Sequence, residues 1–205
     1  EHELTLKGLR RPSCLGPIET ESLRLEGSTP LPRRLRTETL TLLNSNLRCL
    51  PNLKGLGMLK FDHSSILRLP KGLEAGVMTI QGCPRLRRLP YGWRSSLVLV
   101  RDCRRLNRIL KPAAIPLVVA LSNLPRLSSL AAGSVYGRLT LENCGLTHLP
   151  SRLKVQRDLV IRHCARFRAL GPETEVGGDL VLEGLPTLKA LPNDLLVHGT
   201  VRWKP

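Results

Sequence analysis

Aromatic residues and long apolar runs are both scarce in this sequence. The 205 residues include only two Trp, two Tyr and two Phe, so any core must be built mainly from aliphatic side chains. No uncharged apolar run approaches the roughly 18 residues that a membrane-spanning helix needs. Because 41% of the residues are hydrophobic and they alternate with polar residues throughout, the composition also excludes an intrinsically disordered chain. The sequence therefore predicts one folded domain over residues 1–205.

Acidic residues are half as common as basic ones. The chain has 16 Asp and Glu against 32 Lys and Arg, which gives a formal net charge of +16. Only eight of the basic residues are Lys, so Arg supplies most of the excess. Such an excess can reflect a basic surface for an acidic protein, a nucleic acid or an anionic lipid. It can also reflect a genome whose codons favour Arg, and composition leaves both interpretations open.

One phrase recurs along the chain at a spacing near 20 residues. Its clearest copies begin at Met78, Leu139, Leu159 and Leu180, and they share the pattern L-x-L-x-x-C-x-(x)-L-x-x-L-P. We call the second apolar residue of each L-x-L the anchor; successive anchors lie 17 to 21 residues apart. The anchors are Leu6, Leu25, Leu42, Phe61, Ile80, Val100, Leu121, Leu141, Ile161, Leu182 and Trp203.

The repeat predicts a stack of parallel strands. In L-x-L the two apolar residues point to one side and the residue between them to the other, as in a strand with one buried face. Stacking about ten to eleven copies buries a continuous core and forms a solenoid. About 20 residues leave no room for a helix on the return path. We therefore expect extended return segments that tolerate the Leu-Pro prolines, and little helix.

The pattern resembles the leucine-rich repeat, L-x-x-L-x-L-x-x-N/C-x-L, over residues 3 to 204. Its length, its Leu-Pro pairs and its Val-x-Gly steps at Val135, Val176 and Val197 are similar to the short bacterial class found in type III secreted effectors of the YopM and IpaH type. That resemblance implies a horseshoe with strands on the concave face and an extended convex side. It also implies a protein-binding domain that a bacterium delivers into the host-cell cytoplasm.

Two alternatives to the effector remain open. Plant immune receptors share the C-x-x-L-x-x-L-P phrase, although their repeats are usually longer. A protein outside the effector class would be cytoplasmic. Neither end of the sequence has the polar cap that a solenoid needs, so we expect a fragment of a longer protein.

Four cysteines occupy one slot of the repeat, three residues after the anchor. They are Cys83, Cys103, Cys144 and Cys164. This slot points into the solenoid, so we expect buried, reduced thiols that pack like small hydrophobic residues. Cysteines of neighbouring repeats would still lie within reach of a disulfide. The reduced form favours a cytosolic site of action.

Motifs for catalysis or cofactor binding are absent. The sequence has no P-loop, H-E-x-x-H, C-x-x-C or G-x-S-x-G. His63 and His163 lie five repeats apart, or on the order of 24 Å, so they cannot form one site. We therefore expect no enzyme activity, cofactor, metal or small-molecule substrate in this chain, although the family resemblance permits a catalytic domain elsewhere.

The concave face is the predicted site for a protein partner. Its side chains alternate in charge and are interrupted by apolar positions, which favours a protein over a phosphate backbone. The residues we assign to it are Lys60, His63, Leu99, Arg101, Asp102, Arg138, Glu142, Arg162 and His163.

A second candidate surface is a stripe of arginines in the loops that follow the strands, which we call the basic edge. It consists of Arg85, Arg87, Arg105, Arg126, Arg166 and Arg168, five or seven residues after their anchors. The stripe would make the chain an electrostatic binder of nucleic acid or anionic membrane. The chain lacks the aromatic residues that stack on bases, so nucleic acid ranks below an acidic protein or a membrane. These positions can also be basic simply because they are the most solvated ones.

Overall fold

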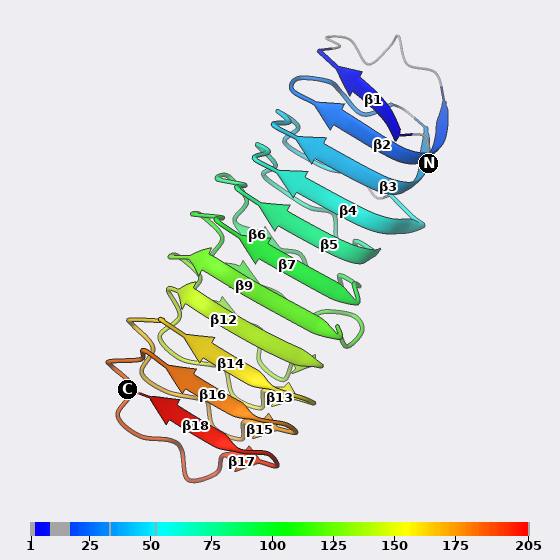
Figure 1. Cartoon of the computed structure of the whole chain (residues 1–205). Helices are drawn as coiled ribbons and strands as arrows, with labels where there is room; N and C mark the ends of the chain where they lie inside the picture. The colour runs from blue at the N-terminus through cyan, green and yellow to red at the C-terminus, as the bar shows by residue number, and fades with distance from the viewer. Residues whose placement is uncertain (1–2, 9–16, 33, 52, 205) are drawn as a thin grey trace.

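The computed structural model describes residues 3–8, 17–32, 34–51 and 53–204. Within these ranges the chain forms strands, turns and extended segments and no helix, so it has no helix that could cross a membrane. Eleven parallel strands form one sheet, called the main sheet, in which they follow one another in chain order (Figure 1). Its strands are β1 (Glu3–Lys7), β2 (Ile18–Glu26), β3 (Leu35–Leu43), β4 (Leu56–Asp62), β5 (Ala75–Gln81), β7 (Leu97–Arg101), β9 (Val118–Leu124), β12 (Arg138–Cys144), β14 (Leu159–Arg162), β16 (Leu180–Glu183) and β18 (Val201–Lys204). The predicted parallel β-solenoid is confirmed.

The register of the main sheet follows the anchors. Each anchor lies opposite the anchor of the next repeat, as in the pairs Leu121 with Leu141 and Leu141 with Ile161. From Leu25 to Leu182 every anchor is buried, and all of them belong to one continuous core. A one-residue slip would turn the whole apolar set of a strand toward solvent, so this alignment is strongly determined.

Two short parallel sheets line the return path, where the sequence predicted only extended chain. One consists of β6 (Arg88–Leu89), β8 (Arg108–Ile109) and β10 (Ser129–Leu130). The other consists of β11 (Val135–Tyr136), β13 (Lys154–Val155), β15 (Glu175–Val176) and β17 (Leu196–Val197). Leu89 of a Leu-Pro pair and Val176 of a Val-x-Gly step are buried in them. Pro90, which follows Leu89, has no N–H to extend the ladder.

A left-handed residue lies at or next to the end of each of the first ten strands of the main sheet, two positions after the anchor. Their φ angles lie between 48° and 71°. Gly, Asn and Asp are the residues that tolerate this conformation best, and they occupy most of the positions. The full set is Gly8, Gly27, Asn44, His63, Gly82, Asp102, Asn123, Asn143, His163 and Gly184.

The position after the left-handed residue, three residues after the anchor, is the slot that was predicted to hold interior cysteines. Cys83, Cys103, Cys144 and Cys164 are buried free thiols, as expected; Cys49 is an exposed free thiol, and Cys14 lies outside the described residues. The Cys144 Sγ lies 3.6 Å from the Leu121 carbonyl oxygen of the preceding turn. The equivalent Ser64 hydroxyl donates to the Leu42 carbonyl at 2.8 Å. These contacts join consecutive turns inside the solenoid.

Candidate binding surfaces

The exposed face of the main sheet carries six of the nine residues predicted to bind a partner. Lys60 and Leu99 stand immediately before their anchors, and Arg138 stands three residues before its anchor. Three more, Arg101, Glu142 and Arg162, stand immediately after their anchors. The remaining three, His63, Asp102 and His163, lie beyond the strands in the left-handed turns. The structure therefore divides the predicted set between the sheet face and its edge.

Several charges on the sheet face pair with a neighbour one strand away. The Arg162 Nε lies 2.8 Å from Glu183 Oε2, and the Arg138 Nη2 lies 2.7 Å from Asp158 Oδ2. The Lys7 ammonium forms an ion pair with Glu26 at 2.6 Å and lowers the pKa of that carboxyl. Exposed pairs of this kind contribute little to stability, but they neutralise charge on the face locally.

A row of apolar side chains crosses the middle of the same face. Met58, Val77, Leu97 and Val118 each stand three residues before an anchor, and each lies opposite the next across β4, β5, β7 and β9. We call these four residues the apolar row. Met58 is 39% exposed, and Leu99, next to the row, is 38% exposed. Contiguous exposed apolar surface is a common property of interaction sites.

A groove of about 1170 Å³ runs beside the apolar row, along the starts of β2 to β7. Its lining includes Gly57 and Gly76, which directly precede Met58 and Val77 of the row. A Cβ on Gly76 would lie 2.7 Å from the Gly57 carbonyl oxygen, so a side chain there would disturb the stacking. The groove was not predicted, although small residues before the strands could have indicated it.

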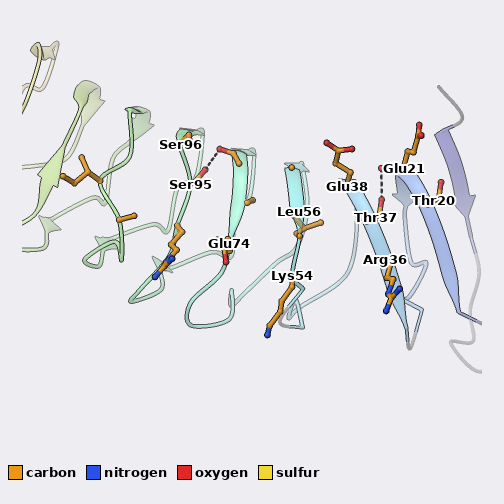
Figure 2. A pocket seen from close by; sticks show the side chains of 17 residues that line it. Thr20, Glu21, Arg36, Thr37, Glu38, Lys54, Leu56, Glu74, Ser95 and Ser96 are labelled. Carbon is orange, nitrogen blue, oxygen red and sulfur yellow. Dashed lines mark hydrogen bonds between the residues drawn. The ribbon is translucent and has the colours of Figure 1, made fainter.

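Side chains of opposite charge diverge from the groove. In Figure 2, Glu21 and Glu38 point to one side, and Arg36 and Lys54 point to the other. The Thr37 hydroxyl donates to the Glu21 carbonyl at 3.1 Å, which ties β2 to β3 at this end. The groove can therefore accept a chain segment that carries both signs of charge.

The left-handed residues form a polar ladder beside a hollow of about 490 Å³. The Asn123 amide donates to Asp102 at 2.9 Å, and the Asn143 amide donates to Asn123 at 3.0 Å. His63 Nδ1 lies 2.6 Å from Asp62 Oδ1. A Cβ on Gly82 would lie 2.8 Å from the His63 ring, so glycine gives that ring its space. These side chains satisfy one another, and no group of three or more potential metal ligands occurs among the described residues.

The six arginines of the basic edge are all exposed. No acidic residue in the described part of the chain forms an ion pair with any of them. Arg87 lines a pocket together with Arg88 and Arg108, which stand one position further along their repeats than the basic edge, and with Arg68, which was not assigned to that edge.

The chain was compared with family models, curated proteins and solved structures, and none of the three comparisons gave a match.

Proposed function

We propose that the chain is a protein-recognition solenoid whose partner binds the exposed face of the main sheet at the apolar row. The observation that carries this proposal is the continuity of the row. Four apolar side chains lie side by side on adjacent strands, and Leu99 extends them toward the strand ends. On the strands beyond the row, Arg138 and Arg162 pair with acidic side chains of the same chain.

Energetics favour the row as the centre of an interface. Protein interfaces draw most of their affinity from a few well-packed apolar or aromatic contacts surrounded by weaker polar ones. Met58 and Leu99 have enough exposed surface to act as such contacts. The groove beside them can hold an adjoining segment of the partner. A formal net charge of +16 would speed association with an acidic partner.

We also propose that the solenoid is a leucine-rich-repeat horseshoe with the main sheet on its concave face. The supporting observation is the slot for Asn or Cys in that repeat pattern, where Ser64 and Cys144 contact carbonyl oxygens of the preceding turn. By the same resemblance, the chain belongs to a bacterial effector that acts in the host-cell cytoplasm. The reduced interior cysteines are compatible with that compartment.

The test uses two matched double variants. Met58→Gln with Leu99→Gln removes apolar contacts from the proposed site without touching the buried core. Val160→Gln with Val181→Gln also replaces two apolar side chains by glutamine, on the neighbouring strands β14 and β16 of the same face. Proteins captured from a eukaryotic cell lysate by the unaltered chain are purified, and each is titrated against the three forms by calorimetry.

We expect a true partner to bind the Met58/Leu99 variant at least about tenfold more weakly, since each lost contact is worth about 1 kcal/mol or more at an interface centre. The Val160/Val181 variant should bind within about twofold of the unaltered chain. Equal affinity of all three forms would show that the partner binds elsewhere. Loss of binding only in a fourth form, Arg126→Ala with Arg168→Ala, would move the function to the basic edge.

A further inference from the structure

An arginine pocket lies where the chain leaves β4, β5 and β7 on its return path. It encloses about 450 Å³ and is lined by Leu67, Arg68, Arg87, Arg88, Asn107 and Arg108. The four arginines are exposed, and no acidic side chain lines the pocket. It lies apart from the apolar row, so the inference drawn from it does not depend on the proposed protein partner.

The backbone register brings two of these arginines directly opposite each other. Arg88 of β6 pairs with Arg108 of β8, and neighbouring strands lie about 4.8 Å apart. Like charges facing each other across a sheet are destabilising. In the other short sheet, residues of opposite charge face each other. Lys154 of β13 lies across from Glu175 of β15, and the Lys154 Nζ lies 2.6 Å from the Glu175 Oε2. The fold thus tolerates an unfavourable arrangement at the arginine pocket that it avoids elsewhere.

No acid within the described part of the chain compensates these arginines. Residues 85–108 contain eight Arg and one acid, Asp102. That carboxylate accepts a hydrogen bond from Asn123 in the polar ladder and does not line the pocket. Within the described chain, the charges of Arg68, Arg87, Arg88 and Arg108 are therefore left to solvent ions or to a bound anionic ligand.

We infer that the arginine pocket binds a ligand carrying two or more phosphate groups. A guanidinium presents a planar fork of donors that matches two phosphate oxygens, and four such groups exceed what a single carboxylate could neutralise. The volume falls within the range of small-molecule sites. Asn107 adds an amide for ligand hydroxyls, and half-buried Leu67 adds an apolar wall. No aromatic side chain lines the pocket for base stacking, so the ligand is a compact polyphosphate and not a nucleic-acid strand.

The inference is tested with inositol 1,4,5-trisphosphate as the soluble probe, titrated by calorimetry at about 0.15 M NaCl, where diffuse attraction is largely screened. Arg88→Gln with Arg108→Gln removes two charges from the pocket. Arg126→Gln with Arg166→Gln removes two charges from the same edge outside it. Arg88→Lys with Arg108→Lys keeps both positive charges but removes the planar guanidinium groups and their paired donors.

We expect saturable binding that the Arg88/Arg108 glutamine pair weakens at least about tenfold, while the Arg126/Arg166 pair changes it less than about twofold. The lysine pair should fall between them, because an ammonium offers no bidentate contact. Circular dichroism of each variant checks the fold, and the lysine pair keeps the test decisive if the glutamine pair unfolds. Equal weakening by both glutamine pairs, or no saturable binding of the probe, would overturn the inference.

A second arm identifies the source of the phosphates. Phosphatidylcholine vesicles containing about 5% phosphatidylinositol 4,5-bisphosphate are compared with vesicles of equal charge made with phosphatidylserine. If the soluble probe binds, pocket-dependent binding to the phosphatidylinositol 4,5-bisphosphate vesicles but not to the phosphatidylserine vesicles identifies a lipid headgroup. Binding of the soluble probe without binding to either kind of vesicle identifies a free phosphate ligand. Tighter binding of a single-stranded oligonucleotide, weakened by both glutamine pairs alike, would contradict a compact ligand.

Discussion

The polar atoms of some buried side chains in the core form hydrogen bonds, whereas those of others do not. Trp93 is fully buried, and its indole N–H donates to the Leu110 carbonyl at 2.9 Å. Tyr136 is equally buried, but its hydroxyl makes no hydrogen bond of good geometry within the described chain. Burial raises the pKa of Tyr136 to about 12, and the nearby Ser134 hydroxyl only partly opposes the rise. An unpartnered buried hydroxyl costs stability.

Tyr136→Phe should therefore leave the free energy of unfolding unchanged or increase it at neutral pH. At alkaline pH, the free energies of unfolding of the unaltered chain and of Tyr136→Phe should differ increasingly. The pKa of Tyr136 is raised from 10.0 in the unfolded chain to about 12 in the fold, so the folded state holds the proton more tightly. Stability due to the protonated hydroxyl is complete below pH 10 and is lost as the pH rises toward 12, at about 1.4 kcal/mol per pH unit.

Urea denaturation at pH 8, 10 and 11 measures this difference. The unaltered chain should lose more stability than Tyr136→Phe between pH 10 and 11, and other titrating groups cancel in the comparison. A loss of more than about 1 kcal/mol in Tyr136→Phe at pH 8 would show that the hydroxyl has a favourable partner after all.

Individual strands depend on the alternation of buried and exposed positions. In β12, Leu141 is fully buried between Leu121 and Ile161, while Thr140 is half-buried on the opposite face. Leu141→Ala should reduce the free energy of unfolding by roughly 2–5 kcal/mol, because it removes a packed side chain and leaves a cavity. Thr140→Ala should cost far less. Equal losses in equilibrium urea denaturation would contradict the assignment of the two faces.

The main sheet could be predicted from the sequence because every repeat carries the same strong signal. All eleven anchors, from Leu6 to Trp203, stand in the predicted strands and in the predicted register. The two short sheets could not be predicted, because a pair such as Arg88–Leu89 is too short to show a period. Their pairing results from the stacking of the turns.

The candidate surfaces were predictable only in part. The phase of Lys60, Leu99 and Arg162 within their repeats placed them on the sheet correctly. The phase of His63 was equally clear, but its left-handed turn takes the side chain off the sheet face. Arg68 has the same seven-residue phase as Arg87, and Arg88 and Arg108 stand one position further along, but the sequence does not indicate that these four side chains line one pocket. The phase of a residue within its repeat therefore does not show which arginines of this edge line a common pocket.

At the scale of the whole molecule, each repeat of the main sheet pairs only with its neighbours in the chain. In such a solenoid, stability is approximately a sum of repeat and interface contributions. The apolar row and the arginine pocket both belong to the central repeats around β4, β5 and β7, but they use different sides of them. One segment of the solenoid could thus hold two ligands of different chemistry.

Because the stability of a solenoid is approximately a sum over its repeats, the effect of charges within one repeat on stability can be measured by substitution. Arg88 and Arg108 face each other without an acidic partner, whereas Arg152 and Lys154 pair with Glu173 and Glu175. At low ionic strength, Arg88→Gln with Arg108→Gln should raise the melting temperature, because it removes repulsion in a chain of formal net charge +16.

The matched variant is Arg152→Gln with Lys154→Gln, which removes the same charge but breaks two attractive contacts. Its melting temperature at low salt should be unchanged or lower, since exposed ion pairs contribute at most about 1 kcal/mol each. Thermal melts followed by circular dichroism at about 0.01 M and 0.5 M NaCl test both variants, because the screening length falls from about 30 Å to a few ångströms over this range. The two variants should differ at low salt and converge at high salt. The contrary outcome is a lower melting temperature of the Arg88/Arg108 variant at both salt concentrations. It would show that the methylene groups of these arginines stabilise the turns by packing, and that this packing outweighs the repulsion between the two charges.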